Sequence, residues 1–168
     1  MKRIFPFALI TFGILLSIGA LSWLYLNNRV SLSTGLDLPN QLAGLRLTES
    51  KSGDQAVSEF TDLHGKSFPV TSGAVGIYGN RDITLWVAST ASDSVALELT
   101  NAMQDRIAEG TSPFTPVDEI NNRNRKVYAL EGMGQKHYYF QSQNLVIWLA
   151  ANPALADEAL QQILEVYS

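Results

Sequence analysis

The side chains best suited to acid-base or metal chemistry are few and far apart in this sequence. Its only two histidines are His64, which follows Asp62 near the end of a predicted helix, and His137, which lies in a predicted strand. Because the 168 residues include no cysteine, a metal site would need both histidines and a carboxylate such as Asp62. Nothing in their spacing brings these residues together, so we predict no metal site. We expect His64 to interact with the negative end of its helix and His137 to be partly buried.

Catalytic motifs are also missing from the sequence. It contains no G-x-S-x-G nucleophile elbow, P-loop, G-x-G-x-x-G, H-E-x-x-H or EF-hand loop. Adjacent carboxylates occur at 118–119 and 157–158, and the second pair is explained by the start of a predicted helix, where acidic side chains are favourable. The absence of cysteine excludes a cysteine nucleophile, a disulfide framework and a lipoprotein acylation site. We therefore predict no catalytic residue and no cofactor.

A single basic cluster interrupts an acidic chain. The sequence carries 12 basic and 16 acidic residues, and two of the basic residues, Lys2 and Arg3, lie at the N-terminus. An acidic domain of this kind is a poor partner for nucleic acid, which we exclude. The cluster covers residues 121–126, Asn-Asn-Arg-Asn-Arg-Lys. It could contact an acidic partner or a phosphate-bearing surface, although loops of this composition are usually only solvated.

Aromatic residues on two predicted strands are the best binding candidates. Trp86 and Trp148 are each flanked by aliphatic residues, so the alternation of a strand places them on the opposite face of the sheet from those neighbours. Together with Tyr138 and Phe140 they could form an aromatic surface or pocket for a protein or a small ligand. The alternative is that helices cover the tryptophans and leave nothing exposed.

The same tryptophans mark a candidate internal repeat. Aligning Trp86 with Trp148 places residues 75–90 on residues 137–152 without a gap, and a helical pattern follows each segment. One explanation is duplication of a β-β-α unit. The other is that apolar hairpins followed by helices resemble one another by pattern alone.

Three helices are predicted in the part of the chain that would position these residues. The first spans residues 54–64, because a capping-box pattern at 52–55 precedes apolar residues at helical spacing. The second spans about residues 93–110, with apolar residues at every fourth position. The third follows Asn152 as its cap, with Pro153 in the first helical position.

Six strands are predicted between and around these helices. They lie near residues 45–47 and over residues 74–78, 83–88, 127–131, 136–141 and 144–151. The intervening stretch 111–126, with Pro113 and Pro116, is predicted to be a polar loop. The order β-α-β-β-α-β-β-β-α indicates an α+β domain with a mainly antiparallel sheet and helices on one face.

An uncharged N-terminal segment is predicted to be a transmembrane helix. It begins at Ile4 and ends at Leu26, and at 1.5 Å per residue it is roughly 34 Å long, enough for a bilayer core of about 30 Å. Lys2 and Arg3 precede it and only Arg29 follows closely, which places the N-terminus in the cytoplasm. We expect a single-pass protein of the cell membrane, with a cytoplasmic tip and anchor over residues 1–26, a linker over 27–41 and an extracytoplasmic domain over 42–168.

Two further readings concern the same segment. Ala20 and Ser22 form a small-x-small pattern that would fit a signal-peptide cleavage site, in which case the domain would be secreted. Small residues at Gly13, Ser17 and Ala20 share one helix face, which would allow a second helix to approach closely and form a homodimer.

These observations favour a non-enzymatic function. We predict a membrane-anchored extracytoplasmic domain that binds, senses or scaffolds, with a protein or a small ligand as partner. The alternative is a membrane-tethered, hydrolase-like enzyme whose site is assembled from scattered residues. A sheet face with exposed Trp86 and Trp148 would favour binding, whereas a closed cleft with a histidine beside a carboxylate of raised pKa would favour catalysis.

Overall fold

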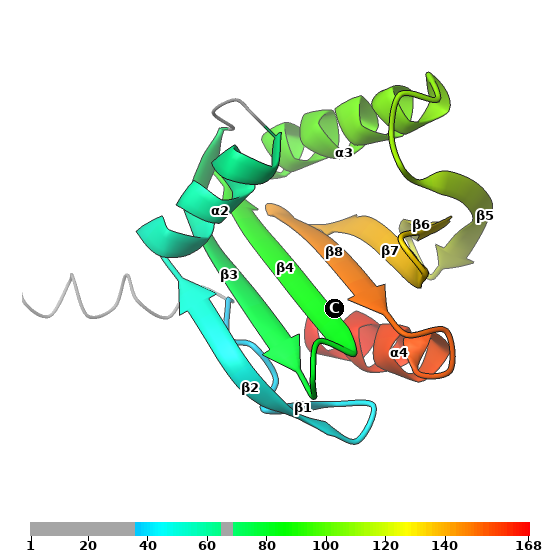
Figure 1. Cartoon of the computed structure of the whole chain (residues 1–168). Coiled ribbons are helices and arrows are strands. Elements are labelled where there is room, and N and C mark those ends of the chain that lie inside the picture. The colour runs from blue at the N-terminus through cyan, green and yellow to red at the C-terminus, as the bar shows by residue number, and fades with distance from the viewer. Residues whose placement is uncertain (1–35, 65–68) are drawn as a thin grey trace, which may run out of the picture. The chain divides into compact units, whose positions relative to one another are not determined.

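Eight strands form one antiparallel sheet at the centre of the domain (Figure 1). The computed structural model describes residues 36–64 and 69–168. Within them the strand order is β1-β2-β3-β4-β8-β7-β6-β5. The sheet therefore consists of two meanders, β1 to β4 and β5 to β8, which are joined where β4 pairs with β8.

The predicted α+β class with a mainly antiparallel sheet is confirmed. The strands are β1 (Gln41–Leu42), β2 (Leu45–Ser52), β3 (Val70–Tyr78), β4 (Ile83–Thr90), β5 (Thr115–Asn122), β6 (Arg125–Gly132), β7 (Gln135–Ser142) and β8 (Leu145–Ala151). The helices of the described residues are α2 (Asp54–His64), α3 (Asp93–Ala108) and α4 (Ala156–Val166).

The two meanders meet at a pair of tryptophans. Trp86 of β4 lies directly opposite Trp148 of β8, and the next pair along the strands is Leu85 with Leu149. Directly paired residues share a face of the sheet, and successive residues alternate between faces. The tryptophans therefore lie on one face and the two leucines on the other. Because both kinds of side chain are large and apolar, both faces of the central strands must be covered.

The face opposite the tryptophans carries the main hydrophobic core. Leu85, Ile147 and Leu149 have no exposed surface there, and they belong to the same core cluster as α4. The helix contributes apolar residues at a spacing of three to four, which places them on one side of it. These are Ala156, Ala159, Leu160, Ile163 and Leu164.

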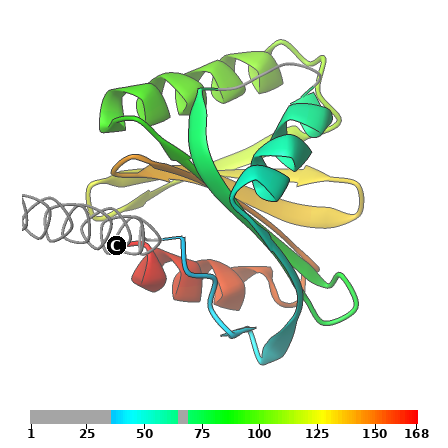
Figure 2. The ribbon, with the colours of Figure 1, turned by 90° about the vertical axis from the view of Figure 1, so that its left-hand side faces the viewer.

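Helices cover both faces of the sheet (Figure 2). On the tryptophan face, Phe60 of α2 belongs to a cluster with Trp86, and Ile107 of α3 belongs to another with Trp148. α4 covers the opposite face. The prediction that the helices lie on one face is therefore wrong. The physical reason is the apolar character of both faces at the centre of the sheet, because neither can be left in contact with water.

The positions of the helices also show whether the β-β-α unit is repeated. α3 follows β4 and packs on the same face as Trp86, whereas α4 follows β8 and packs on the face opposite Trp148. Superimposing the two hairpins through their tryptophans would place the two helices on opposite sides. The β-β-α units therefore do not repeat as wholes, and the similarity is confined to the pattern of the hairpins.

The predicted helices differ from the observed ones mainly at the start of the last. The bounds predicted for α2 coincide with those observed, and Ser92 caps α3, since its Oγ accepts the N–H of Val95 at 3.4 Å. α4 begins later than predicted, with Leu155 as N-cap and no side-chain cap. Asn152 does not cap it, because its side-chain amide donates instead to Asp82 Oδ1 at 2.8 Å.

The predicted polar loop at 111–126 is wrong over residues 115–122, which form strand β5. β5 is the outer strand of its meander and pairs only with β6, with a register shift between Pro116 and Asp118. An edge strand tolerates proline and charged residues because one of its sides needs no hydrogen-bond partner. Such a strand lacks the apolar alternation by which strands are recognised.

The described domain begins before the predicted linker ends. Leu36 and Leu38 pack on the main core, and the hydroxyl of Tyr78 donates to the Pro39 carbonyl at 2.9 Å. Residues 36–40 are therefore part of the folded domain. The predicted anchor over residues 4–26, with Gly13, Ser17 and Ala20, lies outside the described residues. In the described ranges, no helix is both long and apolar enough to cross a bilayer.

Candidate functional site

A groove of about 760 Å³ lies between α3 and the turns that join β5 to β6 and β7 to β8. Its volume is in the range of ligand-binding pockets. We call it the α3 groove. Its helical wall consists of Asp93, Leu97, Thr100, Asn101 and Gln104. Its sheet wall consists of residues 123–126, Tyr128, residues 141–143 and Ser168.

The helical wall is a single stripe along α3. The residues of this wall recur at intervals of three, four and seven, which places them on one side of a helix with 3.6 residues per turn. Most of them are polar, and Leu97 is the exception, with 49% of its surface exposed. Thr100 is buried, and its hydroxyl donates to the Ala96 carbonyl at 2.9 Å. The stripe therefore offers both amide groups and one apolar contact.

The sheet wall is built from two hairpin turns. Arg123 begins the β5–β6 turn with φ of 55°, and Gln143 begins the β7–β8 turn with φ of 52°. Positive φ is costly for residues with a β-carbon. Glycine would relieve this strain at both positions, yet both carry long polar side chains that line the groove. Two of the strained residues of the domain thus lie in one wall of the site.

Arg125 connects the groove to the C-terminal end of α4. Its guanidinium donates to the Leu164 carbonyl at 3.0 Å and also to the Tyr167 carbonyl. Its carbon Cζ lies 5.6 Å from the centre of the Phe140 ring. Burial, and then the nearby Arg123, lower the pKa of Arg125 below its usual range. The charge of this arginine is thus used to satisfy carbonyls at the negative end of a helix.

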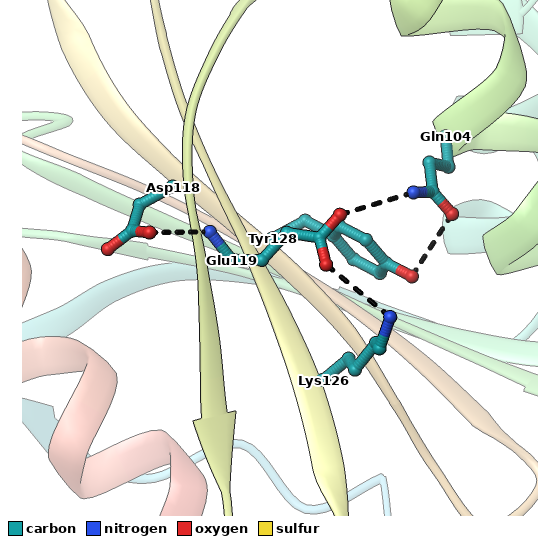
Figure 3. A network of polar contacts seen from close by, with 5 residues as sticks. All are labelled: Gln104, Asp118, Glu119, Lys126 and Tyr128. Carbon is teal, nitrogen blue, oxygen red and sulfur yellow. Dashed lines mark hydrogen bonds and ion pairs between the residues drawn. The ribbon is translucent and has the colours of Figure 1, made fainter.

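A polar network closes the end of the groove where α3 meets β5 and β6 (Figure 3). The hydroxyl of Tyr128 donates to Gln104 Oε1 at 3.1 Å, and Gln104 Nε2 donates to Glu119 Oε1 at 3.4 Å. Lys126 Nζ lies 3.4 Å from Glu119 Oε2, and Asp118 Oδ1 accepts the backbone N–H of Glu119 at 2.8 Å. The network ties the helix to the edge of the sheet and holds Gln104 and Lys126 in place.

Six polar side chains of the groove, including Arg123, Asn101 and Asn124, have no such partner among the described residues. Arg123, Asn101 and Asn124 are exposed, and none of their side chains makes a hydrogen bond or ion pair to another described residue. They come from both walls of the groove. A guanidinium offers donors only, whereas a primary amide offers donors and an acceptor. These side chains are therefore available to a ligand.

The remaining tryptophan face is filled by an aromatic row that crosses the sheet. The Tyr128 and Tyr139 rings stack at 4.7 Å between centres, and the Tyr139 and Trp148 rings stack at 5.3 Å. Trp86 continues the row on β4, and its indole N–H donates to Glu59 Oε1 of α2 at 3.3 Å. Trp86 and Trp148 are half-buried, so neither the fully exposed nor the fully covered arrangement predicted for them is found.

Tyr138 and Phe140 lie elsewhere. Across the β7–β8 ladder, Tyr138 pairs with Leu149 and Phe140 with Ile147, whereas Tyr139 pairs with Trp148. They are therefore on the α4 face, with 4% and 0% of their surface exposed. The prediction that they share a face with the tryptophans is wrong, because residues of odd and even number in β7 point to opposite faces. A binding role for Trp86, Trp148, Tyr138 and Phe140 stays a prediction.

His137 has a structural role. It is buried, and its Nδ1 accepts the indole N–H of Trp148 at 3.2 Å, which leaves the proton on Nε2 for donation to the Gly132 carbonyl at 3.0 Å. Burial lowers the pKa of His137, and the bond to Gly132 opposes this shift only in part. Both ring nitrogens are therefore occupied in a neutral ring. At His64 the structure describes the backbone and not the side chain, so the interaction expected for that side chain stays a prediction.

The described residues contain no group of three or more histidine, cysteine or carboxylate side chains that could hold a metal ion. Comparison of the chain with protein-family models, curated proteins and solved structures finds no match. The function is therefore inferred from the groove itself.

Only one part of this groove was predictable from the sequence. The basic cluster at 121–126 supplies its β5–β6 turn. The polar stripe of α3 could have been read from the three-residue spacing of Asn101 and Gln104, which places both on one side of the helix. The contribution of Gln141 and Gln143 had no signal in the sequence, because it depends on how two distant hairpins lie side by side in the sheet.

Proposed function

We propose that this protein is a single-pass membrane protein whose extracytoplasmic domain binds a partner in the α3 groove without catalysing a reaction. The anchor in this proposal is the uncharged run of residues 4–26, and its orientation follows from the positive charges that precede it. The groove offers a concave surface on the domain that this anchor would display.

The observation that carries the binding role is the set of free polar side chains in the α3 groove. Arg123, Asn101 and Asn124 face a concavity of about 760 Å³ and have no partner among the described residues. By contrast, His137, the histidine whose side chain the structure describes, has both ring nitrogens occupied. A pocket with unsatisfied donors and acceptors is suited to recognition.

Site-specific photo-crosslinking in intact cells tests the binding role. A photoreactive amino acid at position 101 of the full-length chain would face the groove, and one at position 102 would be exposed on α3 but outside it. We expect a discrete crosslinked product from position 101 and none from position 102. Equal products from both positions, or none from either, would contradict a binding site in the groove.

The membrane topology is tested separately. A C-terminal tag on the full-length chain should be removed by protease added to intact cells, and the protein should remain full length in the membrane fraction. A protected tag would contradict the proposed orientation. A shortened, soluble product would instead support the secreted alternative, with cleavage near Ala20 and Ser22.

A further inference from the structure

We propose that the α3 groove binds a short, extended peptide segment that carries an acidic side chain, with Arg123 as the partner of its carboxylate. This inference rests on the proposed binding function and names the class of ligand. It is drawn from the length, the charge and the hydrogen-bonding groups of the groove.

The length of the groove fits a peptide and exceeds the size of a single ion. Its helical wall runs from Asp93 to Gln104, and at 1.5 Å rise per residue this distance is about 16 Å. An extended chain rises about 3.3 Å per residue, so about five residues would fill the groove. Leu97, exposed midway along the wall, would contact one apolar side chain of such a segment.

The charge of the groove favours an acidic ligand at one end. Arg123, Arg125 and Lys126 all line the β5–β6 turn, although the protein as a whole has a net charge of −4. Arg125 is bound to α4 carbonyls and Lys126 is paired with Glu119. Arg123 is therefore the cation that remains for a ligand. A guanidinium binds a carboxylate through two parallel hydrogen bonds.

The other end of the groove has the opposite preference. Asp93 is exposed there, and its backbone carbonyl accepts Gln141 Nε2 at 2.8 Å, which places it beside the β7–β8 turn. A carboxylate at this end would meet a like charge. We therefore expect the acidic side chain of the peptide to bind at the Arg123 end only.

The free amides distinguish a peptide from a simple anion. Asn101 and Asn124 each offer N–H donors and a carbonyl acceptor, and they lie on opposite walls of the groove. A peptide backbone presents both a donor and an acceptor at nearly every residue. A small anion such as phosphate is chiefly an acceptor and would use mainly the donors. The amides are thus suited to hold a backbone, while Arg123 selects the side chain.

Positional libraries of blocked pentapeptides test this inference. In each pool one position holds Glu and the other four are randomised, and a matched pool holds Gln at the same position. The full-length protein in detergent is bound to the immobilised pools. We expect Glu pools to bind at least about tenfold better than Gln pools at one position near an end of the peptide, as for a charge-assisted hydrogen bond.

Two variants and their controls assign the effect to the groove. Arg123→Ala should abolish the preference for Glu over Gln, and Arg46→Ala, at an exposed arginine of β2 outside the groove, should leave it unchanged. Asn101→Ala should weaken Glu and Gln pools alike, whereas Asn80→Ala in the β3–β4 turn should weaken neither. No preference for Glu, or a preference that survives Arg123→Ala, would overturn the inference.

Two further results would separate this inference from the binding function. If inorganic phosphate displaced the Glu pools as well as a matched free peptide did, the groove would be an anion site and the peptide inference would be wrong. If position 101 crosslinked in cells but no pool showed a preference for Glu, the binding function would be supported. The inference that the ligand is an acidic peptide would then be wrong. Loss of both signals would overturn both proposals.

Discussion

The two faces of the sheet are built in different ways. On the α4 face, one continuous cluster joins the central strands to the helix and to the residues before β1. On the other face, α2 and α3 each cover a separate, smaller cluster. The first face is a single core of mostly aliphatic side chains, and the second is divided between two helices that leave Trp86 and Trp148 half-buried.

Aromatic side chains make hydrogen bonds on both faces. Trp148 bonds to His137 and Tyr128 bonds to Gln104 on the α3 face, and Tyr138 bonds to Asp157 on the α4 face. Only the α3 face continues into the α3 groove, which Tyr128 and Gln104 line. The comparison indicates that the stability of the fold comes mainly from the α4 face. The other face can then present polar side chains to a ligand, because less of the core depends on it.

The largest expected difference between the faces is in the cost of deleting an aromatic ring. Phe140 is fully buried on the α4 face, and Phe140→Ala should reduce the free energy of unfolding by about 3–5 kcal/mol. Phe114 is half-buried on the α3 face beside Trp148. Phe114→Ala should therefore reduce the free energy of unfolding by less than about half of the amount expected for Phe140→Ala. Urea unfolding followed by tryptophan fluorescence measures both. Equal losses would contradict the asymmetry.

The arginine that joins the two regions should have the next largest effect. Arg125→Ala would leave the Leu164 and Tyr167 carbonyls at the end of α4 without a charged donor. We expect a loss of about 1.5–3 kcal/mol in unfolding free energy. Arg123→Ala is the matched control, since that side chain has no described partner, and it should change stability by less than about 0.5 kcal/mol. Similar losses in both variants would argue against capping by Arg125.

His137 should make the stability of the α3 face depend on pH near neutrality. Its folded-state pKa is lowered by burial, so the unfolded state binds the proton more readily. Stability should therefore fall as the pH falls below about 6.5, the usual histidine pKa, and level off below the folded pKa. Replacement of His137 by Gln should remove this dependence, even if it lowers stability at every pH. If the melting temperature of the His137→Gln variant depended on pH as that of the unmodified protein does, His137 would not be the origin of the pH dependence.

The smallest effect is expected at the N-terminal end of α4. The hydroxyl of Tyr138 donates to Asp157 Oδ1 at 2.7 Å, and this bond, followed by Lys136, lowers the pKa of Asp157. A lowered carboxyl pKa contributes stability above about pH 4 that is lost as the pH falls through the folded pKa. Because Asp157 is exposed, the contribution is small.

Two substitutions test this contribution. Both Asp157→Asn and Tyr138→Phe should reduce the loss of stability between about pH 4 and pH 2, measured by thermal unfolding at a series of pH values. Asp157→Asn in a Tyr138→Phe background should add little further. Two fully additive effects would show that the hydrogen bond is not their common origin.

Local patterns predicted most of the secondary structure of the domain. The apolar periodicities of residues 54–64 and of the helix that begins at residue 93 depend on side chains within a few residues of one another, and both helices were predicted correctly. The cap at Asn152 was wrong, because a contact with Asp82 from a distant turn competes for its side chain. β5 was missed because an edge strand requires no apolar alternation.

The candidate site was predictable only in part for the same reason. The cluster at 121–126 was recognisable as the one basic segment. That Arg125 would turn toward α4 while Arg123 would face the groove depends on the packing of the C-terminal helix. Tyr138 and Phe140 were placed on the wrong face, although the alternation of β7 relative to β8 decides this once the register is known.

The sequence by itself determined the α+β class, the alternation of the strands and the absence of cysteine chemistry, because these follow from composition and from side chains close together in the chain. Only the tertiary structure decided that helices cover both faces, that Trp86 lies opposite Trp148, and that α3 and two hairpin turns enclose a groove. Those features depend on strand order and register, which are set by the burial of apolar surface between segments far apart in sequence.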